Sequence, residues 1–145
     1  MPPLVQRYVK TAFAFLLLGL LTGAVITISQ NLLDRPIPLL LIVAHVHALL
    51  VGFVLMLIIG VATWMFPRPA QGNARYRPGL AAAIYWTLTF ATALRFAAEV
   101  LAAWQPGRGL RLLIAAGGLG QALAGFLFVY NMWVRVRAPS TLREP

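Results

Sequence analysis

The chain has 145 residues, of which 61% are hydrophobic and 10% are charged, whereas a soluble domain averages about 45–50% apolar and about 25% charged residues. A soluble protein of this composition could not cover its surface with polar groups, so we expect lipid to surround much of the chain and one compact unit at this length. The net charge of +9 comes without a basic stripe that alternates with aromatic residues, which argues against a nucleic-acid partner. The lack of cysteine excludes disulfides, iron–sulfur clusters held by thiolates and covalently attached haem.

Four apolar runs are each long enough to cross a bilayer, which takes about 20 largely apolar residues of helix. In chain order they lie at about 8–28, 39–66, 80–104 and 110–134. Prolines border these runs, because proline is tolerated at a helix start and ends a helix elsewhere. The first run is too long for a usual signal-peptide core and lacks a clear cleavage site, so we expect a retained helix. The sequence predicts an all-α protein, an integral membrane antiparallel four-helix bundle, with a single domain at 1–137 and a flexible cytoplasmic tail at 138–145.

The positive residues divide unequally between the two ends of this bundle. Short connections at about 29–38, 67–79 and 105–109 make consecutive helices antiparallel neighbours. One end then holds Arg7, Lys10, Arg68, Arg75, Arg77, Arg135, Arg137 and Arg143, and the other holds Arg35, Arg108 and Arg111. Because cytoplasmic loops carry the excess of Lys and Arg, we expect a multi-pass protein of the cell inner (cytoplasmic) membrane with both termini cytoplasmic. The second helix would then run inward from the outer side.

Glycines are concentrated on two of the predicted helices. Gly19 and Gly23 form a small-xxx-small pair on the first helix, and the fourth carries Gly117, Gly118, Gly120 and Gly125. Such residues let helix backbones approach closely. The pattern fits packing within one chain or an interface between copies.

Four ionisable side chains lie inside the apolar runs, where a charge is costly and commonly has a function: His45, His47, Arg95 and Glu99. At about 1.5 Å of helix rise per residue, all four fall roughly 7.5–13.5 Å below the outer ends of their helices. Arg95 and Glu99 are four residues apart, so they share a helix face and can pair. This pair could simply neutralise itself, or Arg95 could bind an anion such as a haem propionate while Glu99 orients it or handles protons.

The two histidines cannot ligate one metal from a regular helix, because two residues apart they point about 200° away from each other. We expect one to face the bundle and the other a neighbouring subunit, an interface or the headgroup zone. Either histidine could instead be only a hydrogen-bonding group between helices.

The run Ala44-His45-Val46-His47-Ala48-Leu49-Leu50-Val51-Gly52-Phe53, continuing to Gly60, Trp64 and Pro67, resembles the second helix of subunit I of haem–copper oxidases and nitric oxide reductases. It resembles still more closely small four-helix relatives of that subunit. The resemblance covers about a quarter of the chain and implies that His47 is the haem ligand, with His45 as an alternative ligand, a supporting group or a copper-binding group. The large subunit has about twelve helices and more histidines, so this chain cannot form a haem–copper centre alone.

The resemblance implies a membrane b-type haem-binding protein, related to cytochrome oxidase subunit I, for electron transfer or for oxygen or nitric oxide handling. Its cofactor would be haem b, held by His47, His45, Arg95 and Glu99, whereas copper has no support beyond the resemblance. The alternative is a cofactor-free accessory or assembly subunit of a respiratory oxidase. Any turnover would belong to a haem-containing oxidoreductase assembly with respiratory-chain partners. Because one chain offers one well-placed histidine to an iron, we expect a homo-oligomer, either a dimer or a trimer.

Overall fold

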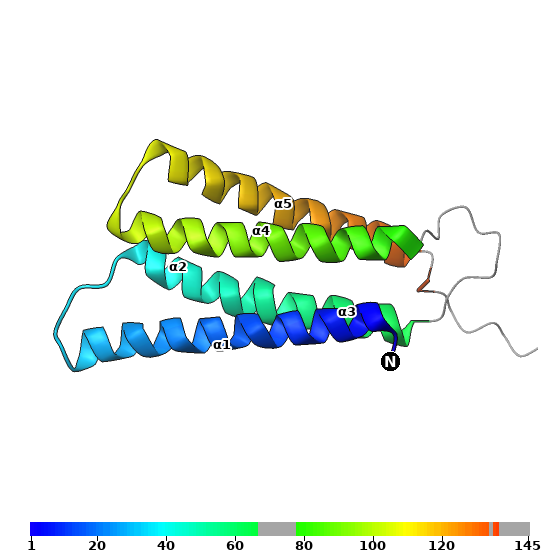
Figure 1. Cartoon of the computed structure of the whole chain (residues 1–145), viewed down its shortest axis with the longest axis horizontal. Helices are drawn as coiled ribbons and strands as arrows, with labels where there is room; N and C mark the ends of the chain where they lie inside the picture. Colours follow the sequence, from blue (N-terminus) through cyan, green and yellow to red (C-terminus); the bar gives the residue numbers. More distant parts are fainter. Residues whose placement is uncertain (67–77, 134, 137–145) are drawn as a thin grey trace, which may run out of the picture.

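The computed structural model describes residues 1–66, 78–133 and 135–136 and contains only helices over that part of the chain. The elements are α1 (Pro3–Asn31), α2 (Leu39–His47), the π-helix η1 (Ala48–Leu55), α3 (Met56–Met65), α4 (Pro78–Trp104) and α5 (Arg108–Trp133). α2, η1 and α3 follow one another without a break and form a single rod (Figure 1). Four spans are long and apolar enough to cross a membrane. The predicted all-α antiparallel four-helix bundle is confirmed.

The observed helices are longer at several ends than the apolar runs. α1 begins at Pro3 rather than near residue 8 and ends at Asn31 rather than near residue 28. Its extra turns carry polar residues such as Gln6 and Arg7, because a helix can continue beyond the hydrocarbon core into the headgroup zone. α4 begins at Pro78, because proline at the first helical position loses no hydrogen bond. The predicted tail at 138–145 and most of the 67–79 connection lie outside the described residues.

The π-helix η1 was not predicted. It begins directly after His47 and spans eight residues before α-helical geometry resumes at Met56. A π-helix pairs residue i with i+5 and is uncommon, being found mostly as short insertions at functional sites. η1 packs mainly against α1, where the ring of Phe15 occupies the space beside Gly52 that a side chain would fill.

The α2–α3 rod packs against α1, and its α2 and η1 part lies between α1 and α4, while α1 also contacts α4 directly near the N-terminal end (Figure 1). α4 packs most extensively against α5 and also contacts α2 and η1. A hydrophobic core joins the spans near the end that carries the N-terminus. It consists of Tyr8, Ala12, Phe15, Met56, Ile59, Ile84, Tyr85, Leu88 and Ala124.

Polar contacts fix the same end of the bundle. The Tyr8 hydroxyl donates to the Ala81 carbonyl at 3.1 Å, and the hydroxyls of Thr11 and Tyr85 lie 2.8 Å apart. Arg135, beyond the end of α5, is buried and donates to the carbonyls of Thr63 and Phe66 at the end of α3. A cation is favourable there because the last carbonyls of a helix carry partial negative charge.

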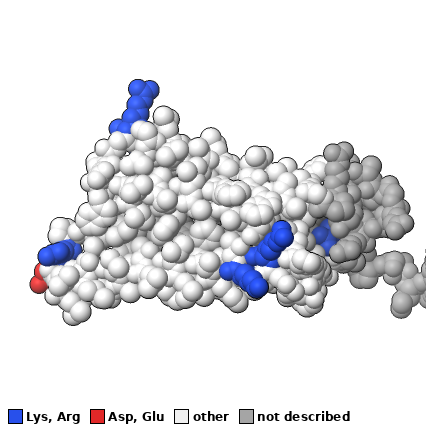
Figure 2. Space-filling model, viewed as in Figure 1, with Lys and Arg blue, Asp and Glu red and all other residues white. Residues whose placement is uncertain are grey.

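The outer surface of the bundle is apolar. Large side chains such as Leu17, Leu21, Leu119 and Phe126 are more than 60% exposed. Figure 2 shows basic side chains near the two ends of the visible face and an uncharged zone between them. In water such a surface would be unstable, whereas lipid is its natural solvent. The chain is a multi-pass membrane protein.

Candidate functional site

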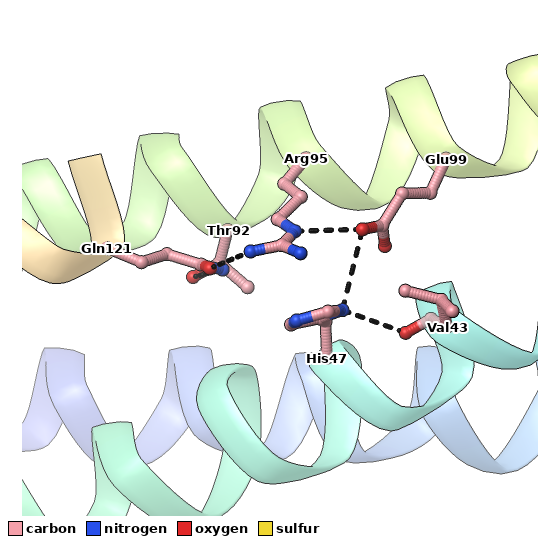
Figure 3. A network of polar contacts seen from close by, with 6 residues as sticks. All are labelled: Val43, His47, Thr92, Arg95, Glu99 and Gln121. Carbon is pink, nitrogen blue, oxygen red and sulfur yellow. Dashed lines mark hydrogen bonds and ion pairs between the residues drawn. The ribbon is translucent and has the colours of Figure 1, made fainter. Parts of the chain in front are cut away.

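Glu99 is the centre of a polar network inside the bundle (Figure 3). Its side chain is fully buried between α4 and α2. Glu99 Oε1 accepts a hydrogen bond from Arg95 Nε at 2.8 Å and lies 3.4 Å from His47 Nδ1. The predicted pairing of Arg95 and Glu99 along one helix face is confirmed, and the structure adds His47 to it across the helix interface.

The network continues from Arg95 to α5. Arg95 Nη1 donates to Gln121 Oε1 at 3.1 Å, and Gln121 Nε2 donates to Thr92 Oγ1 at 3.2 Å. Gln121 and Thr92 are buried, so the hydrogen bond between them is shielded, whereas the one from Arg95 is only partly buried. The network therefore joins α2, α4 and α5 at one level of the bundle.

Glycines make room for this arrangement. A Cβ at Gly117 would lie 2.7 Å from Arg95 Cβ and 2.9 Å from the Ala91 carbonyl oxygen, and one at Gly118 would lie 3.0 Å from Arg95 Nη1. Of the two interpretations of the glycine pattern, packing within one chain therefore holds for these positions. Gly125, on the same helix, has nothing within 4 Å of its Cβ position.

The surroundings of His47 define which of its nitrogens carries the proton. Nδ1 lies 2.9 Å from the Val43 carbonyl oxygen and 3.4 Å from Glu99 Oε1, which already accepts from Arg95. Both neighbours are acceptors, so the proton belongs on Nδ1. The neutral ring then has its lone pair on Nε2, the form in which histidine binds metals. The side chain is 22% exposed, so protein does not enclose the imidazole completely.

His45 points to a different helix. Its Nδ1 lies 2.8 Å from the Gly19 carbonyl oxygen of α1, and its ring fills the notch that Gly23 leaves. A Cβ at Gly23 would be 2.7 Å from His45 Cε1 and 3.5 Å from Nε2. The two histidines thus face opposite neighbours, as their spacing predicts. Both rings hydrogen-bond within the chain and both remain partly exposed, so the expectation that one of them faces a neighbouring subunit, an interface or the headgroup zone stays a prediction.

Sequence reasoning missed two members of the site. Thr92 and the Val43 carbonyl take part, and only the three-residue spacing from Thr92 to Arg95 hinted at the former. Glu99 Oε2 is buried and has no hydrogen-bond partner within the described part of the chain.

The site lacks the ligands of a bare metal ion. No group of three or more His, Cys, Asp or Glu side chains comes together among the described residues. Haem iron differs, because the porphyrin supplies four nitrogens and the protein needs to supply only one or two axial ligands. One lone pair on a partly accessible imidazole therefore fits a haem better than it fits a bare ion.

An apolar pocket lies elsewhere, on the surface of α3. It is lined by Leu57, Ile58, Val61, Ala62, Met65 and Phe66. These residues begin ten positions after His47 along the rod, so the pocket is separate from the polar network. Its open apolar walls suit contact with lipid chains.

The fold and the site together define a class: a multi-pass α-helical membrane protein with a histidine–carboxylate–arginine network around a buried glutamate. Comparisons with protein-family models, with curated proteins and with solved structures find no match.

Proposed function

We propose that the chain is a membrane b-type haem-binding protein in which His47 would hold the iron through Nε2. The observation that carries this proposal is the pair of acceptors at Nδ1, the Val43 carbonyl and Glu99 Oε1. Histidines that bind metals typically donate their other ring N–H to a carbonyl or a carboxylate, which fixes the tautomer and the ring orientation. A haem there would serve electron transfer or the handling of oxygen or nitric oxide.

His45 is the weaker candidate ligand because its ring packs closely against α1. Contact with the Gly23 notch leaves little room between α1 and α2 for a porphyrin at His45 Nε2. Copper is not proposed, since the two histidines face different helices and cannot share an ion.

Arg95 has a smaller role toward a propionate than the sequence suggested. Its Nε and Nη1 are occupied by Glu99 and Gln121. Nη2 has no hydrogen-bond partner among the described residues, so one guanidinium nitrogen remains for a propionate.

A second candidate function is that of a cofactor-free accessory or assembly subunit of a respiratory oxidase. It is favoured by the closure of the network within one chain, where polar side chains join helices as they commonly do in membranes. Absorption spectroscopy of the purified protein separates the two. The haem proposal predicts a Soret band and split visible bands on reduction. A colourless protein that takes up no added haem refutes the proposal and supports the accessory role.

We also propose that the protein forms a homo-oligomer, a dimer or a trimer, with respiratory-chain partners. A six-coordinate haem needs a second axial ligand, and His45 cannot reach the iron held by His47 from the opposite side of the same helix. A second copy could supply it. Native mass in detergent, measured with haem stoichiometry and spin state, tests this. A monomer with a low-spin bis-histidine haem contradicts it.

We place the protein in the inner (cytoplasmic) membrane with both termini cytoplasmic, on the basis of the uneven distribution of Arg and Lys. Since the chain has no native cysteine, single introduced cysteines report topology cleanly. A cysteine at Gln71 should react with an impermeant thiol reagent only from the cytoplasmic side, and one at Arg35 only from outside. The opposite pattern inverts the orientation.

A further inference from the structure

We propose that Glu99 is a positioning residue for His47: it increases the electron donation of the imidazole to iron and so lowers the reduction potential of the haem. This inference rests on the haem-binding function proposed above. The inference goes beyond that function because it assigns control of the haem reduction potential to Glu99, a carboxylate on a different helix from His47, with Arg95 as the opposing charge.

The first step of the argument is geometric. Glu99 Oε1 lies 3.4 Å from His47 Nδ1, on the side of the ring away from Nε2. The hydrogen bond of Nδ1 is with the Val43 carbonyl oxygen at 2.9 Å, so the carboxylate acts on the ring as a nearby negative charge, which makes the imidazole a stronger donor to a bound metal. A stronger donor stabilises Fe(III) more than Fe(II), because the ferric ion has the higher charge.

The second step concerns charge. Glu99 is fully buried, and its Oε2 has no hydrogen-bond partner among the described residues. Its negative charge is therefore compensated mainly by Arg95, at 2.8 Å, and is poorly screened in an interior of low polarity. A nearby negative charge favours the ferric state, and the Arg95 cation opposes that effect.

The third step is that the carboxylate is held in place. Arg95 anchors Glu99 Oε1, Gln121 anchors Arg95, and Thr92 accepts from Gln121. Side chains from α4 and α5 thus fix the position of an oxygen that faces a histidine on α2, as Figure 3 shows. Such an arrangement suits the tuning of a ligand, because a mobile carboxylate would not hold a constant potential.

Redox titration of the purified holoprotein against mediators tests the inference, with one electron reducing Fe(III) to Fe(II). Glu99→Gln should raise the midpoint potential, whereas Arg95→Gln should lower it. Asp34→Asn is the matched control, since it removes an exposed acid from the loop after α1, and it should leave the potential unchanged. Opposite shifts from two neighbouring residues are not expected of a merely structural pair.

Because either single change leaves one charge without its partner, the double variant Arg95→Gln/Glu99→Gln is a necessary second test. It keeps the net charge and removes the carboxylate from Nδ1, so it should raise the potential by less than Glu99→Gln does. If the wild-type protein carries haem and neither Glu99→Gln nor the double variant changes the potential, the inference is wrong and the haem proposal survives. If the wild-type protein carries no haem, both fall.

Discussion

At the scale of single residues, the structure accounts for two opposite charges in an otherwise apolar bundle. An isolated Arg or Asp at the centre of a membrane helix costs about 2.5–3.5 kcal/mol for insertion. Arg95 and Glu99 meet at 2.8 Å on one helix, so they can enter the membrane as a neutral pair. Removing one partner of such a buried pair typically costs about 3–5 kcal/mol. The pair therefore contributes to stability as well as being a candidate for function.

Gly117 and Gly125 give a residue-scale prediction, since they lie on the same helix with different surroundings. Gly117→Ala should destabilise the protein by about 1–3 kcal/mol, as overpacking does, because its Cβ would meet the Ala91 carbonyl oxygen at 2.9 Å. Gly125→Ala meets open space and should be neutral or stabilising by a few tenths of a kcal/mol, since alanine is the better helix former. Thermal unfolding in detergent, followed by circular dichroism, compares them.

The substitutions Gly117→Ala and Gly125→Ala also test whether each glycine serves packing within one chain or an interface between copies. Loss of oligomers in Gly125→Ala with unchanged stability would assign that glycine to an interface between copies. Equal destabilisation by the two substitutions would mean that the close α4–α5 approach at Gly117 does not govern stability.

The sequence predicted some contacts of the site and not others, for physical reasons. Spacing alone pairs Arg95 with Glu99, because a helix places residues i and i+4 side by side. Contact between His47 and Glu99 depends on the rotation of two helices about their axes, which depends on packing along their whole length. Thr92 could not be recognised because threonine in a membrane helix often bonds to its own backbone, as Thr22 does with the Leu18 carbonyl at 2.8 Å.

At the scale of elements, apolar length and flanking prolines located all four spans, because a bilayer demands a helix of nearly fixed length. Helix ends were less accurate, since polar residues at the headgroups continue the helix after the apolar pattern stops. The π-helix had no sequence signal. Eight consecutive apolar residues, Ala48–Leu55, are compatible with either helical form, so their composition does not distinguish an α-helix from a π-helix.

The place of η1 is relevant to the site. It begins at the residue after His47, so the histidine stands at the junction of two helical geometries. Both histidines still lie in α2, which explains why their opposite directions follow the regular helical estimate. The change of geometry begins too late along the chain to bring His45 toward the iron proposed at His47.

At the scale of the whole molecule, the main hydrophobic core and the network of Glu99 lie in different halves of the bundle. The hydrophobic core and the Tyr8–Tyr85 contact lie toward the N-terminal end, and the network of Glu99 lies toward the end with the 32–38 and 105–107 connections. Most residues of each span are at least partly exposed, which suits a solvent of lipid rather than water for this apolar surface. Large apolar surfaces on every span also leave ample area for partner subunits.

The central claim is that His47 ligates haem directly, and chemical rescue of a cavity variant tests it most directly. His47→Gly removes the imidazole and leaves space for a free one. We expect the purified variant to lack the Soret band after haem is added, and to regain it when imidazole is supplied in excess. His45→Gly should bind haem without imidazole, because that ring packs against α1, where it fills the notch beside Gly23 and hydrogen-bonds to the Gly19 carbonyl. Normal haem binding by His47→Gly, or rescue by imidazole in His45→Gly alone, would contradict the assignment.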